Sequence, residues 1–296
     1  MSSATPDALP LVSVIVPHYR DLDGLRVCLA ALDLQTYPRA RFEVVVADNN
    51  SPEGEAAVAA VVAGRAKLAV VTEQGAGPAR NGGVAASTGR LLAFTDSDCI
   101  PEPQWLAEGL AALENVDIVG GAMQVLVADE ADMTPAEAFE RVFAFDNRHY
   151  VIRKGFTVTA NLFCARAVFE AVGGFRVGVP EDLDWCHRAR AAGYRIGYAP
   201  DARVGHPARR TWTEIVRKWS RLNEEAFGLA RTERMGRVKW LVKALAMPLS
   251  AIAQTARPFS TPKLTAGRDR LSALRMLYLM RFWRAADSLR LLARRP

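Results

Sequence analysis

Short apolar runs rich in β-branched residues alternate with helical patterns through the first hundred residues, and this alternation strongly limits the fold. The runs are LVSVIVP (11–17), FEVVVADNNS (42–51), KLAVVTEQG (67–75) and RLLAFTDSD (90–98). Between the first two, apolar residues recur at helical spacing at Leu25, Cys28, Leu29 and Leu32. Buried strands that alternate with helices are typical of a parallel sheet covered on both faces. The sequence therefore predicts an α/β fold with a mostly parallel sheet flanked by helices.

Composition narrows the class of protein. The chain has 296 residues, of which 50% are hydrophobic and 24% charged, as expected of a globular chain with a large core. Its four cysteines lie far apart and form no CxxC pair, so neither a zinc site nor a disulfide framework is predicted. The first ten residues, MSSATPDALP, lack the features of a signal peptide. These features favour a cytoplasmic protein.

Charge divides the chain into two parts. Residues 1–208 carry 18 basic and 26 acidic side chains, whereas residues 209–296 carry 20 basic and 6 acidic ones. We predict a flexible N-terminus at 1–10, a catalytic α/β domain at 11–208 and a basic, mainly helical C-terminal extension at 209–296. The uncharged run 244–256 is shorter than the roughly 20 residues that span a bilayer, and Pro248 is expected to interrupt it. An anionic membrane surface is the favoured partner, because no nucleic-acid recognition module is present.

Three aspartates stand at the ends of two of the predicted strands. Asp48, Asp96 and Asp98 stand at carboxyl ends, where open α/β sheets bind ligands. Asp96 and Asp98 are separated only by Ser97, and two carboxylates that close favour a shared divalent cation on a diphosphate. A turn or a helix cap would also account for the pair. Asp48 suits a nucleobase or a ribose hydroxyl, or simply a turn.

Three further signals are weak in isolation. GPARNGG (77–83) places Arg80 near a helix start that suits an anion, but it matches no standard phosphate loop. Glu181 and Asp182 open a helix, where acids favour the dipole, and either could serve as a general base. His206 follows the last predicted strand and is either a surface histidine or a metal ligand.

The order and spacing of these segments carry more information than any one of them. VIVPHYR, VVVADNNS, GPARNGGVAASTGRLLAFTDSDCIPEPQWL, TANLFCARAVFEAVGGF, PEDLDWCHRARAAGYRI and YAPDARVGH follow one another in this order. Over about residues 11–206 the chain resembles the family 2 glycosyltransferases, which have a GT-A fold. The resemblance implies an inverting glycosyltransferase of the hexosyltransferase type. Its donor would be a UDP-, dTDP- or GDP-sugar, and its cofactor Mg²⁺ or Mn²⁺.

The resemblance also implies roles for individual residues. Those expected to bind the donor nucleotide are Pro17, Tyr19, Asp48, Arg80 and Asp96. Asp98 and His206 would ligate the metal. Asp182 would be the general base that takes the proton of the acceptor hydroxyl. Asn161, Glu181 and Trp185 would line the sugar and acceptor pocket.

The motifs depart from the family pattern in two places. Pro-His-Tyr-Arg stands where Pro-x-Tyr-Asn is common, and Asp-Asn-Asn-Ser where Asp-x-Gly-Ser is common. Both changes bear on base or sugar preference. Many relatives glycosylate lipid-linked or cell-envelope acceptors, so an enzyme held peripherally at the inner face of the plasma membrane is expected.

Two rival functions remain open at this point. A degenerate glycosyltransferase would bind a nucleotide-sugar without turnover, and the intact Asp96, Asp98 and Asp182 argue against it. A phosphatase with a DxD motif would carry that motif after a strand near the chain start, whereas here it follows the fourth predicted strand.

Overall fold

The computed structural model describes residues 9–294, which form two compact units. Unit 1 comprises the chain up to Gln124 together with Asp146–Val177 and Glu181–His206, and unit 2 comprises Val125–Phe145, Gly178–Pro180 and the chain from Pro207 onward. The sequence-based boundary near residue 208 placed 125–145 in the catalytic domain, whereas here this segment packs within unit 2. The predicted flexible N-terminus, 1–10, falls mainly on residues 1–8, which lie outside the described residues.

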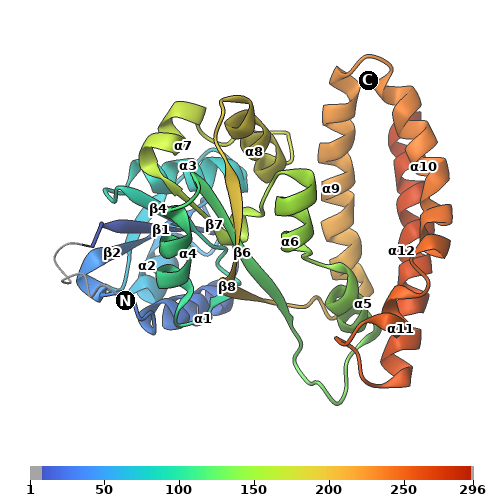
Figure 1. The fold of residues 1–296 in the computed structure, drawn as a ribbon, viewed down its shortest axis with the longest axis horizontal. Helices are drawn as coiled ribbons and strands as arrows, with labels where there is room; N and C mark the ends of the chain where they lie inside the picture. Colours follow the sequence, from blue (N-terminus) through green and yellow to red (C-terminus); the bar gives the residue numbers. More distant parts are fainter. Residues whose placement is uncertain (1–8, 295–296) are drawn as a thin grey trace. The chain divides into compact units, whose positions relative to one another are not determined.

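Unit 1 is built on a mixed sheet with the strand order β3-β2-β1-β4-β7-β6-β8-β5 (Figure 1). The strands are β1 (Val12–His18), β2 (Phe42–Asp48), β3 (Lys67–Val70), β4 (Leu91–Phe94), β5 (Ile100–Pro101), β6 (Ile118–Leu126), β7 (Leu162–Ala165) and β8 (Ile196–Pro207). Strands β1 to β4 are parallel, as predicted, while β7 runs antiparallel to both β4 and β6. The parallel half brings the ends of β1, β2 and β4 to one edge.

Helices cover both faces of this sheet (Figure 1). They are α1 (Leu22–Asp33), α2 (Glu55–Val62), α3 (Ala76–Ala85), α4 (Trp105–Leu113), α6 (Asn147–His149), α7 (Arg166–Val172) and α8 (Glu181–Ala191). Val14 and Val16 pack toward α1, α2 and α4, while Ile15 packs toward α3, α7 and α8. Alternate residues of a strand point to opposite faces. A strand covered on both sides must therefore be apolar throughout, which explains the continuous runs seen in the sequence.

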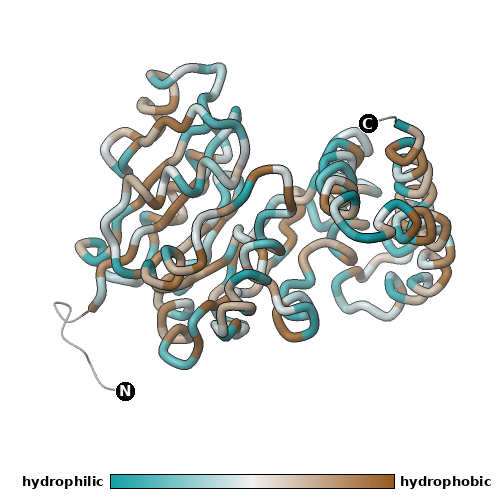
Figure 2. The backbone as a smooth tube through the Cα atoms, turned by 90° about the horizontal axis from the view of Figure 1, so that it is seen from above, coloured by the Kyte–Doolittle hydropathy of each residue, from teal (hydrophilic) through white to brown (hydrophobic). Residues whose placement is uncertain are grey.

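Unit 2 is helical. Its helices are α5 (Pro135–Phe143), α9 (Trp212–Thr232), α10 (Gly236–Ala253), α11 (Arg257–Ser260) and α12 (Gly267–Ala293). Thr134 and Glu137 form a capping box at the start of α5. Ala136 and Phe139 of α5 pack against Ile215, Met276 and Leu277 of the C-terminal helices, and this contact draws α5 into unit 2. In Figure 2 brown and teal alternate along these helices, as expected of amphipathic segments.

The prediction that Pro248 interrupts the apolar run is wrong. Pro248 lies inside α10, which continues to Ala253. A proline removes one backbone hydrogen bond. The helix continues because Trp240, Ala244, Met247 and Ala251 form one buried face on both sides of the proline. Within the described residues, no helix combines the length and the hydrophobicity needed to cross a bilayer.

Candidate active site

The carboxyl ends of β1 and β2 place His18 beside Asp48. These two residues are register partners in the parallel pair, and the His18 Nδ1 atom lies 2.8 Å from the Asp48 Oδ1 atom. Ser51 donates to the same carboxylate from its backbone N–H at 3.0 Å and from its hydroxyl at 2.5 Å. Burial alone would raise the pKa of Asp48, but the hydrogen bonds from Ser51 and His18 outweigh it, so the pKa is lowered.

This arrangement refines the predicted role of Asp48. The residue is 1% exposed, and its carboxylate already accepts bonds from within the protein. His18 is also 1% exposed, and its Nε2 atom is buried without a hydrogen-bond partner among the described residues. Sequence reasoning did not select His18 as a site residue, because it occupies the variable position of the Pro-x-Tyr-Asn pattern and carries no signal of its own. Of the two other predicted base-pocket residues, Pro17 is buried and Tyr19 is exposed.

Arg80 joins two distant segments of the site. Its side chain is 4% exposed and donates to Asp96 at 2.5 Å and to Glu181, which lies 101 residues further along the chain. Burial would lower the pKa of Arg80, but the carboxylates of Glu181 and Asp96 raise it above its ordinary value, so the guanidinium stays charged. The prediction placed Arg80 under the nucleotide and Glu181 in the sugar pocket. In the structure the two side chains are paired with each other.

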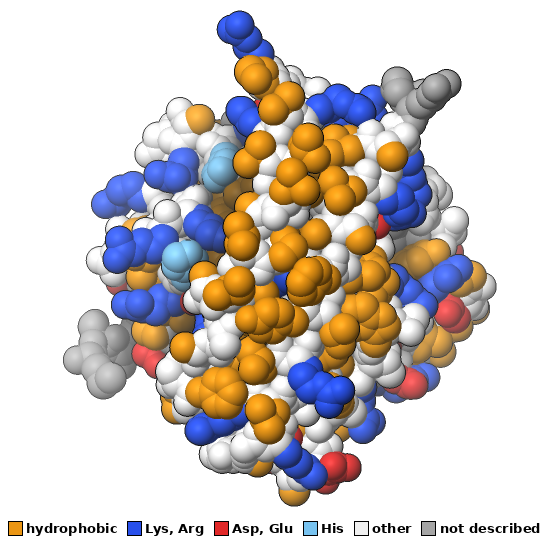
Figure 3. Space-filling model, turned by 90° about the vertical axis from the view of Figure 1, so that its right-hand side faces the viewer, with side chains coloured by type: hydrophobic (Ala, Val, Ile, Leu, Met, Phe, Trp, Pro, Cys, Tyr) orange, Lys and Arg blue, Asp and Glu red, His pale blue; other side chains and the backbone are white. Residues whose placement is uncertain are grey.

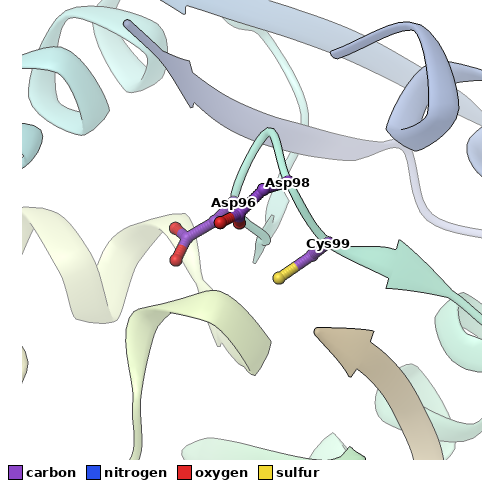
Figure 4. A group of neighbouring side chains, drawn as sticks. All are labelled: Asp96, Asp98 and Cys99. Atoms are coloured by element: carbon purple, nitrogen blue, oxygen red, sulfur yellow. The ribbon is translucent and has the colours of Figure 1, made fainter. Parts of the chain in front are cut away.

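Asp96 and Asp98 stand on the turn between β4 and β5, with their carboxylates on the same side of it (Figure 4). Ligand atoms of Asp96, Asp98 and Cys99 all lie within 4.8 Å of one another. Strand β8 adds a fourth group, because it pairs antiparallel with β5 through Ile100 and Gly205. The His206 Nε2 atom therefore reaches within 3.4 Å of the Asp98 Oδ2 atom, and His206 is 6% exposed.

The chemistry of these donors fits a divalent cation such as Mn²⁺ or Mg²⁺. Carboxylate oxygens are preferred by such cations, and imidazole is a common ligand of transition metals. Cys99 fits such a cation less well, because its thiol is fully buried and sulfur is a soft ligand, whereas Mg²⁺ and Mn²⁺ prefer oxygen. Asp98 and His206 are therefore the residues that would hold the cation, with Asp96 committed on one oxygen to Arg80.

Asp182 begins α8 beside Glu181. Burial, which is the largest influence, raises its pKa to about 6, and the charge of Glu181 acts in the same direction. The backbone N–H of Leu183 and the charge of Arg80 oppose that rise. A carboxylate with a pKa near the working pH is suited to general-base catalysis.

Two predicted pocket residues have structural roles instead. Trp185 is 0% exposed, stacks on Phe169 with ring centroids 5.8 Å apart, and donates from its indole N–H to the Gly173 carbonyl. Asn161 is 0% exposed, donates to the carbonyls of Ala122 and Ala202, and accepts from the Trp105 indole. Their hydrogen bonds are made inside unit 1, so neither side chain lines an open pocket.

Comparison with known proteins identifies the family. The model for the family described as Glycosyl transferase family 2 matches residues 13–178, more than half of the chain. The chain belongs to glycosyl transferase family 2. As a family 2 enzyme it is a glycosyltransferase with a nucleotide-sugar donor, and the GT-A-like fold predicted from the motifs is confirmed.

Relatives of this family 2 chain come from archaea and bacteria. Glycosyltransferase AglE of Haloferax volcanii is 34% identical over 224 residues, covering 73% of each chain. A pre-mycofactocin glycosyltransferase of Mycobacterium tuberculosis is 30% identical over 70% of this chain, which spans only 45% of that protein. Mannosyltransferase PcManGT of Pyrobaculum calidifontis, solved with GDP-Man and Mn²⁺, superimposes with a TM-score of 0.64 at 21% identity. The superposition covers 98% of this chain and 89% of the mannosyltransferase chain, and it shows that the two share a fold.

Proposed function

We propose that Asp182 is the general base of an inverting sugar transfer from a UDP-, dTDP- or GDP-sugar, with Asp98 and His206 holding a divalent cation. The observation that carries this proposal is the Arg80 bridge. It holds Asp96 of the DxD turn and Glu181, the neighbour of Asp182, in one cluster despite their separation in the sequence. Donor-binding and base-bearing segments therefore meet at one edge of the sheet.

In the proposed reaction, the Asp182 carboxylate accepts the proton of the acceptor hydroxyl while that oxygen attacks C1 of the donor sugar. The bond from C1 to the diphosphate breaks on the opposite side, and this inverts the anomeric centre. A cation at Asp98 and His206 would supply positive charge near the leaving diphosphate. Asp48, fixed by His18 and Ser51, would border the nucleotide at the end of β2 together with Pro17 and Tyr19.

A thermal-shift panel of UDP-, GDP- and dTDP-sugars, with and without Mn²⁺, tests this assignment. One nucleotide class is expected to raise the Tm of the wild type by about 5 °C at about 100 Kd, and only with the metal. Asp98→Asn should abolish the metal-dependent part of the shift, because it removes one of the two proposed metal ligands. The control Asp201→Asn changes an exposed carboxylate on β8 and should respond like the wild type. A normal response of Asp98→Asn would contradict the metal assignment.

We also propose that the acceptor is a cell-envelope glycan or a lipid-linked precursor, and that unit 2 holds the enzyme peripherally on the inner face of the plasma membrane. Support comes from the outer face of α10. Its apolar residues recur every three or four positions, which places them on one side of a helix. This α10 stripe consists of Val238, Val242, Leu245, Leu249 and Ile252, each more than half exposed. Figure 3 shows apolar side chains gathered on this side of the molecule.

Charge around the α10 stripe favours an anionic lipid surface over other occupants. Arg237, Lys239 and Lys243 lie on the same helix. The only acidic residues in 236–294, Asp269 and Asp287, are 2% and 5% exposed and so offer no repulsion. Each basic residue near an anionic leaflet contributes about 1 kcal/mol, and apolar side chains add the insertion free energy. The apolar stripe, rather than net charge alone, is therefore expected to dominate the interaction.

Removing apolar surface from the α10 stripe should release the protein from vesicles. We expect Leu245→Gln/Leu249→Gln to lower co-sedimentation with phosphatidylglycerol vesicles at least about tenfold, since two inserting side chains are lost. Leu34→Gln is the matched control, because Leu34 is 68% exposed but lies at the end of α1 in unit 1. Equal vesicle binding by the double variant and the wild type would overturn the proposal. A dimer in light scattering that the double variant abolishes, without vesicle binding, would assign the face to self-association instead.

A further inference from the structure

A basic cleft lies in unit 1 away from the Asp96–Asp98 turn. Its volume is about 790 Å³, within the range of small-molecule sites. It is formed by α6, the following π-helical turn η3 (Tyr150–Lys154), the C-terminal end of α8 and the beginning of β8. Its polar lining consists of Arg148, Arg153, Arg190, Arg195, Tyr194 and Tyr198.

The cleft is separate from the proposed donor site. Tyr198 lies near one end of β8 and His206 near the other. At about 3.3 Å per residue along a strand, the two are about 26 Å apart. Along α8, Arg190 stands at the opposite end from Glu181 and Asp182. A ligand in the cleft would therefore not contact the residues proposed to bind the donor or the metal.

Basic side chains dominate this cleft. Within the part of the chain that the structure describes, no acidic residue lines it. Among residues 9–294, the side chains of Arg148, Arg153 and Arg190 make neither an ion pair nor a hydrogen bond, so their guanidinium donors are available. Arg195 is already partly balanced, because it donates to the Asn115 carbonyl at 3.1 Å and pairs with the Asp117 carboxylate at 3.8 Å. Three guanidinium groups without an ion-paired carboxylate repel one another in one concave surface, and an anion bound there would relieve that repulsion.

Local structure holds two of these arginines against the cleft wall. A Cβ atom on Gly155 would lie 2.1 Å from the Arg190 Nη1 atom, so the guanidinium packs directly on the glycine backbone. Gly155 also has φ +69°, a conformation that favours glycine. Burial raises the pKa of Tyr198, the charge of Arg148 lowers it and the charge of Asp146 raises it, so Arg148 lies near Tyr198 with Asp146 also in the neighbourhood. Turns of π-helix such as η3 are frequent at functional sites.

We propose that this cleft binds an organic ligand with a diphosphate group. Arginine donates in a planar fork that matches phosphate oxygens, and the tyrosine hydroxyls add donors. A diphosphate group carries several negative charges at neutral pH, which suits three guanidinium groups without ion-paired carboxylates. Val151, Ile152 and Ile196 provide apolar lining for the organic part of the ligand. This site is independent of the proposed function of the Asp182 cluster.

Calorimetric titration of the full chain with inorganic pyrophosphate in EDTA tests the proposal, because chelation removes any metal from Asp98 and His206. Arg148→Gln/Arg190→Gln should raise the Kd at least about tenfold. The control Arg26→Gln/Arg65→Gln removes the same charge from α1 and the end of α2 and should bind within about twofold of the wild type. Asp98→Asn should also bind normally. Unchanged binding by the cleft variant, or loss of binding by Asp98→Asn, would overturn the assignment.

Two further measurements on the wild-type chain test the proposal even if the cleft variant folds poorly. Phenylglyoxal should modify Arg148 and Arg190 of the wild type, and pyrophosphate should protect both; modification unaffected by pyrophosphate would count against the cleft. Titration with dihexanoyl phosphatidic acid, a water-soluble lipid with a single phosphate, tests the need for two phosphate groups. Weaker binding of this lipid than of pyrophosphate would support the diphosphate assignment, and tighter binding would overturn it.

Discussion

Asp182→Asn is expected to lower kcat for sugar transfer by about 10²–10⁴-fold while leaving the Kd for the donor unchanged. The asparagine keeps the size of the side chain but cannot accept the proton of the acceptor hydroxyl, and general-base catalysis contributes a factor of this size. Donor binding is retained because Asp98, His206 and Arg80 are untouched. Asp184→Asn is the matched control. Asp184 lies in the first turn of the same helix and pairs with Arg188 at 2.8 Å, so its loss should change kcat only slightly.

The pH dependence of kcat/KM should identify the same residue. Because the pKa of Asp182 is raised to about 6, kcat/KM should fall about tenfold per pH unit below pH 6, where the carboxyl is protonated and cannot act as a base. The residual activity of Asp182→Asn should not show this fall in kcat/KM below pH 6. A chain that binds donor without turnover would show the metal-dependent thermal shift and no transfer at any pH. Full transfer by Asp182→Asn would exclude Asp182 as the base.

The stability of Asp182→Asn distinguishes a catalytic role of Asp182 from a structural one. A carboxyl whose pKa is higher in the folded than in the unfolded state favours folding when protonated. Its contribution to stability is therefore lost as the pH rises from its ordinary pKa of 3.8 through about 6. At pH 7 the charged Asp182 is a cost to folding that a neutral asparagine does not carry. Asp182→Asn should then be at least as stable as the wild type at pH 7 in urea unfolding, although its kcat is strongly reduced.

Arg80→Met is expected to destabilise the protein by about 3 kcal/mol and to abolish most activity. The methionine fills the space but leaves Asp96 and Glu181 facing each other without a cation, and breaking a buried ion pair costs about 3–5 kcal/mol. The lower end of this range of free energies applies because the side chains of Asp96 and Glu181 are 31% and 22% exposed. Urea unfolding measures the loss, and transfer should be assayed where the variant remains folded.

Two comparisons sharpen the Arg80 prediction. Arg80→Lys keeps the charge but cannot bridge both carboxylates with a planar fork, so it should be intermediate in stability and activity. Arg26→Met breaks the pair with Asp23, whose side chains are 54% and 95% exposed, and should cost less than about 1 kcal/mol. An unchanged urea midpoint for Arg80→Met would show that the bridge does not hold the DxD turn to α8.

Much of unit 1 was predictable because its signals are local. The strands β1 to β4 and the helices between them follow from apolar periodicity over a few residues, and Asp48, Asp96 and Asp98 follow from their positions after those strands. In unit 2, the capping box of α5 is a similarly local signal, because it needs only the four consecutive residues 134–137. The order of the motifs then identified the family, since each motif lies within a short stretch and their spacing is readable along the chain.

Contacts between distant segments were decided only by the tertiary structure. Arg80 pairs with Glu181, 101 residues further along the chain, and His18 pairs with Asp48, 30 residues further along. No local sequence pattern predicts either pair. Trp185 and Asn161 were read as pocket residues because a motif gives residue type but not burial, and both lie fully inside unit 1. Pro248 stays within α10 because packing on its buried face outweighs one lost hydrogen bond. Sequence periodicity specified the elements and the ends of the strands, whereas the partners of the charged side chains depend on how those elements pack.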